Sequence, residues 1–321
     1  MNNRITAGLA LLVLVLSLQS PLRVFGDGKP VGRLTYEAFK QFYEYDKGLP
    51  LEVNIGEDVQ ILPTTQCPGH RRIKLSFMST HDERAPAIIW IPLESKRPVP
   101  CSFYLHGLGQ NKEAAEPFAY DLLKKGIATM ALDAAYHGER AAGKQPLYGA
   151  NFHRLRDGYM QTVVDYRRAL DYLLTRPEID ASRITLIGMS MGAIMGAVLA
   201  GVEERIKCPV LLVGGADRGL MSRVSQIPVW KQIRAENPNL DFDEISRVMA
   251  PADPLNFVDK ISPRPVLMIN GTKDELVPVA ANKLLHSTAR EPKKIVWLES
   301  GHTLPFDQTF PIVNEWLKNN L

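Results

Sequence analysis

The sequence predicts an α/β fold built on a mostly parallel, doubly wound sheet, and three observations support this class. From residue 118 onward, short apolar runs alternate with segments of helical periodicity. The apolar runs are continuous rather than alternating, which is typical of parallel strands covered by helices on both faces. Polar and glycine-containing segments follow the ends of several runs, where an open α/β sheet usually carries its functional site.

The composition is that of an ordinary soluble globular protein and excludes several functional classes. The chain has 321 residues, of which 45% are hydrophobic and 23% charged, and its formal net charge is +3. Basic and acidic residues are interspersed, so no basic block predicts nucleic-acid binding. The seven histidines lack metal-ligand spacing with cysteines or carboxylates. We therefore expect no metal, no cofactor and no nucleic-acid partner.

Residues 1–26 are predicted to be a secretory signal peptide. A positive start at Arg4 precedes an apolar run over residues 7–18, which is shorter than the roughly 20 residues that cross a bilayer. We expect cleavage after Gly26, a secreted or periplasmic protein, and no stable membrane insertion after cleavage. The alternative is an uncleaved segment that anchors the chain in the membrane.

Residues 27–70 are predicted to be a lead-in to one large domain over residues 71–321. The lead-in carries a candidate helix over residues 36–45 and a candidate strand over residues 49–55. Three apolar or alternating runs then predict strands over residues 72–79, 85–93 and 100–107.

The remainder of the domain alternates between helices and strands. Helical periodicity or glycine termination predicts helices over residues 118–126, 155–175, 278–289 and 308–319, with a further helix after Ser190. Apolar runs predict strands over residues 127–133, 184–189, 209–215, 265–271 and 294–300. Residues 218–260 interrupt this rhythm as a predicted insertion, or lid, with two short helices separated by Asn237-Pro238.

Three cysteines in a chain of this size do not predict a disulfide framework. Cys101 and Cys208 each begin an apolar run, so we expect them to be buried thiols. The sequence leaves a bridge that involves Cys67 open.

The stretch Gly188-Met189-Ser190-Met191-Gly192 lies where an apolar strand meets a helix rich in small residues. A G-x-S-x-G motif at such a junction predicts a sharp turn that exposes a nucleophilic serine, and the glycines remove side chains that would clash. The helix N-terminus also favours negative charge beside the serine. We therefore predict Ser190 as a nucleophile.

A serine nucleophile needs a base, and the base needs an acid that orients it. Asp274 follows the strand over residues 265–271 and His302 follows the strand over residues 294–300, so the chain order is serine, acid, histidine. We predict Asp274 as the acid and His302 as the base. Asp217, after the preceding strand, is the rival acid, and Asp274 has the alternative role of a helix cap.

Acyl transfer also needs two N–H donors that stabilise an oxyanion. We predict the first at Met191, directly after the nucleophile, and the second at Leu108 in the loop after the strand over residues 100–107. His106 in that loop is expected to have a structural role. The polar stretch with Asp133 and His137 is expected to be a hydrogen-bonded loop that shapes the site.

These motifs resemble the α/β-hydrolases. The segments HGLGQNK, DAAYHGER, GMSMG, NGTKDELVP and SGHTLP are similar to those of the dienelactone hydrolase, acetyl xylan esterase and prolyl oligopeptidase-like branch. The resemblance implies an α/β-hydrolase fold with a Ser190, Asp274 and His302 triad. Dienelactone hydrolases carry a cysteine nucleophile, whereas this chain has Ser190, which favours ester hydrolysis.

The sequence therefore predicts a serine esterase that acts on small-molecule carboxylic esters. The mixed and charged insertion offers little apolar surface, so short acyl groups are expected to be favoured over long ones. A small peptidase or thioesterase of the same fold is the enzymatic alternative. A catalytically inactive binding protein is the alternative outside enzymes. The sequence indicates neither the natural substrate nor the oligomeric state.

Overall fold

The computed structural model describes residues 35–321 with the exception of residues 66, 94, 96 and 144. The predicted signal peptide over residues 1–26 therefore lies outside the described residues, as does the lead-in up to residue 34. Within the described part of the chain, no helix has both the length and the apolar character needed to span a membrane.

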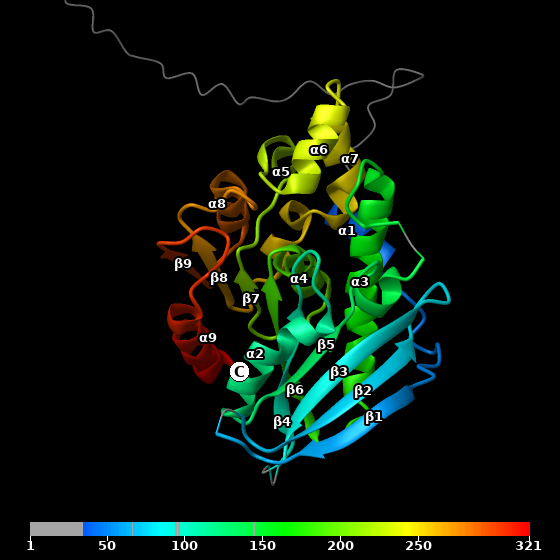
Figure 1. Ribbon diagram of the computed structural model, residues 1–321, viewed down its shortest axis with the longest axis vertical. Coiled ribbons are helices and arrows are strands. Elements are labelled where there is room, and N and C mark those ends of the chain that lie inside the picture. The colour runs from blue at the N-terminus through cyan, green and yellow to red at the C-terminus, as the bar shows by residue number, and fades with distance from the viewer. Residues whose placement is uncertain (1–34, 66, 94, 96, 144) are drawn as a thin grey trace, which may run out of the picture. The chain divides into compact units, whose positions relative to one another are not determined.

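One twisted sheet forms the centre of the described domain (Figure 1). Its nine strands lie in the order β1-β2-β3-β5-β4-β6-β7-β8-β9. The pairs β1/β2, β2/β3 and β3/β5 are antiparallel, and the five remaining pairs are parallel. The strands span Asn54–Ile61, His70–Met78, Arg84–Pro92, Val99–Leu105, Ala128–Leu132, Ile179–Met189, Val210–Leu212, Val266–Gly271 and Lys293–Leu298. The predicted α/β class with a mostly parallel sheet is thus confirmed.

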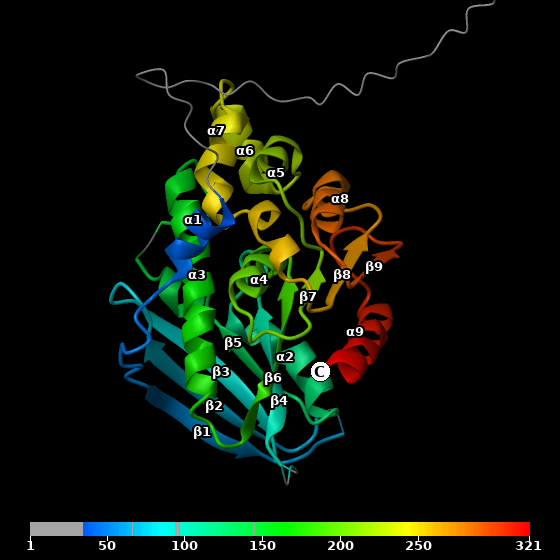
Figure 2. The same ribbon diagram turned by 180° about the vertical axis from the view of Figure 1, so that it is seen from behind.

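Helices cover both faces of this sheet (Figures 1 and 2). α2 and α9 pack on the face turned toward the viewer in Figure 1, and α3, α4 and α8 pack on the other. The α-helices α1 to α9 span Tyr36–Lys40, Glu116–Leu123, Phe152–Leu173, Met191–Val202, Arg218–Val224, Pro228–Glu236, Phe242–Met249, Val279–Thr288 and Phe306–Asn320. The 3₁₀ helices η1 to η6 span Gln41–Tyr43, Lys112–Ala115, Gly138–Ala141, Ala250–Ala252, Pro254–Asn256 and Val258–Lys260.

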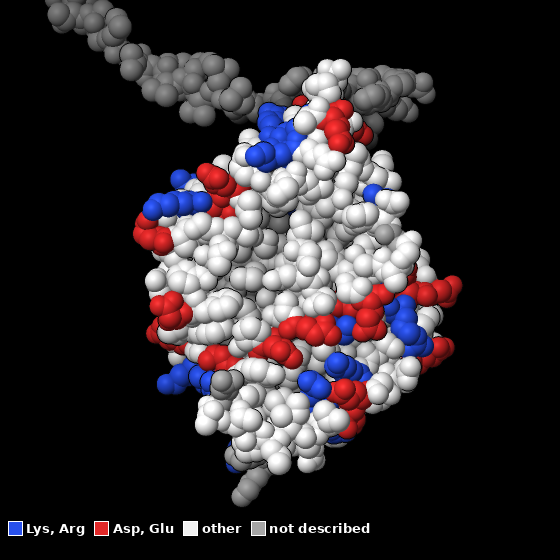
Figure 3. Space-filling view, viewed as in Figure 1, with Lys and Arg blue, Asp and Glu red and all other residues white. Residues whose placement is uncertain are grey.

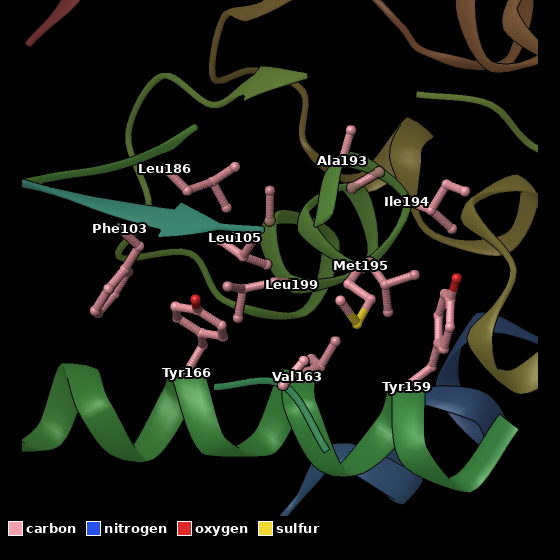
Figure 4. Close-up of a cluster of buried hydrophobic side chains, with 14 of the residues drawn as sticks. Phe103, Leu105, Tyr159, Val163, Tyr166, Leu186, Ala193, Ile194, Met195 and Leu199 are labelled. Carbon is pink, nitrogen blue, oxygen red and sulfur yellow. The ribbon is translucent and has the colours of Figure 1, made fainter. Parts of the chain in front are cut away.

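The long helix α3 holds the nucleophile-bearing helix α4 in place. Tyr159, Val163 and Tyr166 recur at helical spacing along α3 and face α4 (Figure 4). Opposite them, α4 presents Ile194 and Met195, and all five side chains are buried. Burying each such side chain stabilises the fold by roughly 1.5–3 kcal/mol. The Tyr166 hydroxyl also donates to the carbonyl of Tyr104 at 2.6 Å, so α3 is tied to the sheet as well.

Several predicted strands differ in extent from those of the structure; β6, for example, begins at Ile179 instead of residue 184. The predicted strand over residues 49–55 is displaced toward the C-terminus: the structure has β1 at Asn54–Ile61, which pairs antiparallel with β2. The predicted strand over residues 209–215 ends after Leu212. Val213 adopts a φ of 47°, and a Cβ on Gly214 would lie 2.9 Å from that of Ala193. The chain therefore turns out of the sheet early, because its backbone passes close to α4.

The segment over residues 218–260 contains three α-helices, whereas the sequence predicts two. The break at Asn237-Pro238 separates α6 from α7, as predicted. The additional helix, α5, begins after Asp217, whose side chain accepts a hydrogen bond from the Leu220 N–H at 2.9 Å. It has only seven residues, and its glycine and serine are weak helix formers, which explains why periodicity does not reveal it. Gly219 allows α5 to pack closely on Ser246 of α7.

Candidate active site

Ser190 sits at the turn between β6 and α4 in a strained backbone conformation. Its φ of 55° and ψ of −115° lie outside the regions that residues with side chains prefer. A Cβ on Gly188 would lie 2.4 Å from the carbonyl oxygen of Gly192, and a Cβ on Gly192 would lie 1.9 Å from that of Leu105. The close approach of three backbone segments therefore explains the glycines on both sides of the serine.

His302 lies between Ser190 and Asp274 and bonds to both. Its Nε2 is 2.8 Å from the Oγ of Ser190. Its Nδ1 is 2.8 Å from Oδ2 and 3.0 Å from Oδ1 of Asp274. The three residues follow β6, β8 and β9, whose carboxyl ends meet at one edge of the sheet. The structure thus brings together the three residues that the sequence singles out.

Asp274 also accepts hydrogen bonds from its own loop. Its Oδ1 accepts from the backbone N–H groups of Leu276 and Val277, each at 3.0 Å. The carboxylate is 3% exposed, so these bonds fix its orientation in a site that water barely reaches. The orienting and capping roles that the sequence offers as alternatives therefore coexist in one side chain.

Asp217, the rival acid, has different partners. Its carboxylate accepts from the Leu220 N–H and caps α5, while its own N–H donates to Asp253 at 3.1 Å. The Nδ1 of His302 is directed to Asp274. The geometry therefore supports Asp274 as the partner of the imidazole.

The two predicted oxyanion donors are backbone N–H groups without a protein partner. The Gly107 N–H donates to Oε1 of Gln110 at 2.9 Å and the Gln110 N–H donates to the Gly107 carbonyl at 3.2 Å. Within residues 35–321 as described, the N–H groups of Leu108 and Met191 donate to no protein acceptor. Met191 is also the first residue of α4, where N–H groups are free to bind an anion.

His106 stabilises the loop that carries Leu108. Its Nε2 accepts from the Ala134 N–H at 3.0 Å, so its Nδ1 carries the proton and donates to the Gly107 carbonyl at 2.8 Å. Burial lowers the pKa of His106 to about 4. The imidazole is neutral near pH 7 and both nitrogens are occupied, in line with the structural role predicted from the sequence.

Asp133 organises the neighbouring loop through a buried ion pair. Its Oδ2 is 2.9 Å from Nζ of Lys112, which also lies 2.7 Å from Glu139. The N–H groups of Lys112 and Glu139 donate to the same carboxylate at 2.9 Å each. His137 bonds the Ala135 carbonyl through Nδ1 at 3.0 Å. Sequence reasoning missed Lys112, because a lysine in a polar loop gives no sign of its burial.

The insertion is fixed to the domain by a second residue that the sequence did not single out. The guanidinium of Arg218 is 2% exposed and lies 5.0 Å from the ring centre of Tyr159, 5.7 Å from Tyr148 and 5.9 Å from Trp230. Tyr159 belongs to α3 and Trp230 to α6, so cation–π contacts connect the insertion to the body.

A further pair of hydrogen bonds connects the insertion to the loop that bears Asp274. The Ser225 hydroxyl donates to the Leu276 carbonyl at 2.6 Å, and the Gln226 N–H donates to the Glu275 carbonyl at 2.9 Å. The end of α5 is therefore bonded to the residues that directly follow the acid.

The cysteines lie apart from this chemistry. All three are free and buried, so Cys67 has no disulfide partner in the structure. Burial raises the pKa of Cys208 to about 11, and its thiol approaches Thr185 Oγ1 at 3.6 Å. Among the described residues, no three His, Cys, Asp or Glu side chains gather in a way that could hold a metal ion.

Comparison with known proteins agrees with this architecture. Residues 145–302 match the model of the prolyl oligopeptidase family, a range that includes Ser190 and Asp274 and ends at His302. Esterase YjfP of Escherichia coli (strain K12) is 24% identical over 197 residues, which cover 60% of this chain and 76% of that protein.

Solved structures extend the likeness over most of the chain. An acetyl xylan esterase from Paenibacillus sp. R4 superposes with a TM-score of 0.72 at 20% identity, covering 89% of this chain and 93% of that one. Acetyl xylan esterase 1 from Thermoanaerobacterium sp. JW/SL YS485 superposes with a TM-score of 0.70 at 14% identity, over 88% and 93% of the two chains. The predicted resemblance is confirmed: residues 145–302 match the prolyl oligopeptidase (peptidase S9) family, the fold is that of the α/β-hydrolases, and acetyl xylan esterases are among its structural neighbours.

Proposed function

We propose that this hydrolase is a serine esterase that cleaves carboxylic esters with short acyl groups. The observation that carries the proposal is the continuous hydrogen-bonded chain from Asp274 through His302 to the Oγ of Ser190. The names of similar proteins, which include an esterase of E. coli and two acetyl xylan esterases, support the same reaction class.

In the first half of the proposed reaction, the Nε2 of His302 accepts the proton of the Ser190 hydroxyl while Oγ attacks the ester carbonyl carbon. Asp274 holds the imidazole and balances its positive charge. When the tetrahedral intermediate collapses, the ester C–O bond breaks and His302 gives the proton to the departing alcohol oxygen. The acyl group remains on Ser190.

In the second half, the same groups act on water. His302 accepts a proton from a water molecule, whose oxygen attacks the acyl carbon. The bond to Oγ then breaks, His302 returns the proton to Ser190, and the carboxylic acid leaves. In both halves we propose that the N–H groups of Met191 and Leu108 bind the oxyanion, because neither has an acceptor among the described residues and Met191 directly follows the nucleophile.

The preference for short acyl groups rests on the packing of the insertion. Five of its large apolar side chains are at most 4% exposed and so contribute to the core: Met221, Trp230, Ile233, Ile245 and Met249. Each methylene of a longer acyl chain would gain about 0.8 kcal/mol only where apolar surface is free to cover it. The five buried side chains therefore have none of their own surface free for a longer acyl chain.

A peptidase activity is the second candidate, and the match to the prolyl oligopeptidase family favours it. The same nucleophile and base would act on an amide, with His302 protonating the departing amine. Paired ester and amide substrates with the same acyl group decide between the two. For an esterase, the ratio of kcat/KM for the ester to that for the amide is far larger than the ratio of their uncatalysed hydrolysis rates.

The decisive experiment compares Ser190→Ala with Ser182→Ala, a serine near the opposite end of β6 whose hydroxyl bonds Asp180. Reaction with a fluorophosphonate and hydrolysis of p-nitrophenyl acetate should be lost in Ser190→Ala and retained in Ser182→Ala, with unchanged circular dichroism in both. Full hydrolysis by a folded Ser190→Ala variant would exclude the proposed mechanism.

A further inference from the structure

A cavity of about 580 Å³ lies beside the candidate active site, on the face of the sheet that carries α2 and α9. Three of its lining residues adjoin the catalytic segments in the sequence. Met189 directly precedes Ser190, and Phe306 follows His302 at the start of α9. The Oε1 of Gln110 accepts from the N–H of Gly107, which directly precedes Leu108. A volume of this size is within the range of small-molecule sites.

Aromatic rings form much of the cavity wall. Tyr104 and Phe118 are buried, with ring centres 5.0 Å apart, and the Phe118 and Phe306 ring centres are 5.8 Å apart at an angle of 80°. Phe306 is 43% exposed at the mouth, and Tyr120 also lines the wall. The electron-rich faces of such rings attract cations, and ammonium groups are well suited to them.

Two carboxylates, those of Glu113 and Glu116, line the same cavity. The Oε2 of Glu113 is buried without a hydrogen-bond partner, while its Oε1 lies 3.6 Å from Nζ of Lys112. That ammonium is closer to Asp133, at 2.9 Å, and to Glu139, at 2.7 Å. One cation therefore faces three carboxylates, and the charge of Glu113 is not fully compensated.

The same face of the molecule is rich in acidic side chains. Asp and Glu side chains form a band across the face on which α2 lies (Figure 3). Of the described residues that line the cavity itself, none is a lysine or an arginine. The carboxylates and the aromatic rings would both attract a cation that enters the cavity, whereas the carboxylates would repel an anion.

Building on the proposed esterase function, we propose that this cavity binds the alcohol part of the ester and selects alcohols that carry an ammonium group. His302 must protonate the departing alcohol oxygen, so the alcohol lies on the side of the site that His302 and Phe306 border. A positively charged group two or three bonds beyond that oxygen enters the cavity between Phe306, Tyr104 and Glu113. The acyl group then occupies the opposite side, beneath the insertion.

The test uses two esters of equal size that differ in charge alone. Acetylcholine carries a trimethylammonium group, and 3,3-dimethylbutyl acetate replaces its nitrogen with carbon. We expect the native enzyme to prefer the cationic ester by about tenfold or more in kcat/KM, because aromatic and carboxylate groups both contribute. In the double variant Glu113→Gln, Glu116→Gln the ratio should fall to within about threefold of one.

A matched control removes the same charge elsewhere. The double variant Glu236→Gln, Glu315→Gln alters two exposed glutamates on α6 and α9, outside the residues that line the cavity. It should retain the native preference for the cationic ester, which separates binding in the cavity from the change in net charge. Circular dichroism of all variants verifies that they are folded.

The outcomes separate this inference from the proposed function. An equal or higher kcat/KM for the neutral ester, or a preference that survives in Glu113→Gln, Glu116→Gln, would overturn the cationic subsite and leave the esterase proposal intact. If p-nitrophenyl acetate and both acetates are all inert, the esterase proposal fails. Calorimetry with phenyltrimethylammonium then tests the cavity alone: binding that weakens at least fivefold in the double variant supports it, and its absence overturns it.

Discussion

Replacing Asp274 with asparagine should disable His302 by reversing its tautomer. In the native site, Oδ1 of Asp274 accepts from the N–H groups of Leu276 and Val277, and Oδ2 faces Nδ1 of His302 at 2.8 Å. The two backbone donors would hold the single oxygen of the amide at the Oδ1 position. The amide NH₂ would then point at Nδ1, which can meet it only as an acceptor.

The size of the effect follows from that geometry. With Nδ1 unprotonated, the proton resides on Nε2, 2.8 Å from the Oγ of Ser190, and the imidazole cannot accept the serine proton. The same change in the well-studied Ser-His-Asp triad lowers kcat by about 10⁴, or about 5 kcal/mol of transition-state stabilisation. We expect a loss of that order here, with little change in the thermal unfolding midpoint.

The measurement is kcat for p-nitrophenyl acetate in Asp274→Asn, with Asp217→Asn as the control. Asp217 caps α5 and does not contact His302 through the bonds described, so its variant should keep activity within about fivefold of native and change stability little, because asparagine caps a helix about as well as aspartate. A loss below tenfold in Asp274→Asn, or a larger loss in Asp217→Asn, would refute the assignment of the acid.

Four further predictions concern the turn, the acyl site, pH and export. Gly192→Ala would place a Cβ 1.9 Å from the Leu105 carbonyl oxygen and should destabilise the fold by at least about 2 kcal/mol in urea unfolding, whereas Gly56→Ala, whose Cβ would meet its nearest neighbour at 3.7 Å, should change stability little. Across p-nitrophenyl esters, kcat/KM should peak between acetyl and butyryl, and a maximum at octanoyl or longer would show that the insertion builds an apolar channel. Burial lowers the pKa of His286 to about 4, below the value of about 6.5 expected in the unfolded chain, so the unfolded state binds the proton more readily. Its contribution to stability is therefore present above about pH 6.5 and lost as the pH falls through about 4, and His286→Gln should reduce the difference between urea midpoints at about pH 7 and pH 4.5. Finally, N-terminal sequencing of protein from the native host should find that the chain starts near Asp27, and retention of Arg4 in soluble protein would contradict cleavage.

The sequence predicted the positions of Ser190, Asp274 and His302 because local patterns encode them. Each residue follows a continuous apolar run, and the carboxyl ends of parallel strands meet at one edge whatever the packing details. The glycines around Ser190 are required by a local backbone turn, so this motif too can be recognised in the sequence. Chain order then separated Asp274 from Asp217, and the contacts of His302 agree with that choice.

The features that the sequence did not predict depend on contacts between distant segments. Lys112 is buried because Asp133, 21 residues later, supplies its charge partner. Arg218 is buried because rings from α3 and α6 surround it. Helix α5 forms although its own residues favour helix only weakly, since α7 packs on it closely at Gly219. The residue types and spacings within one segment do not identify contact partners in distant segments.

Because the insertion is attached to the domain at two places, we expect it to keep its position and not to open and close as a mobile lid. One end of its first helix is bonded to the loop of Asp274, and the Arg218 guanidinium lies among rings of the body and of α6. A swing of this segment away from the strand ends would pull on the same backbone that aligns the acid, so an opened enzyme would also be a misaligned one. For the proposed esterase we therefore expect an insertion that keeps its position during turnover, and the exposed turn at residues 238–239 is a place where added or deleted residues would disturb neither anchor.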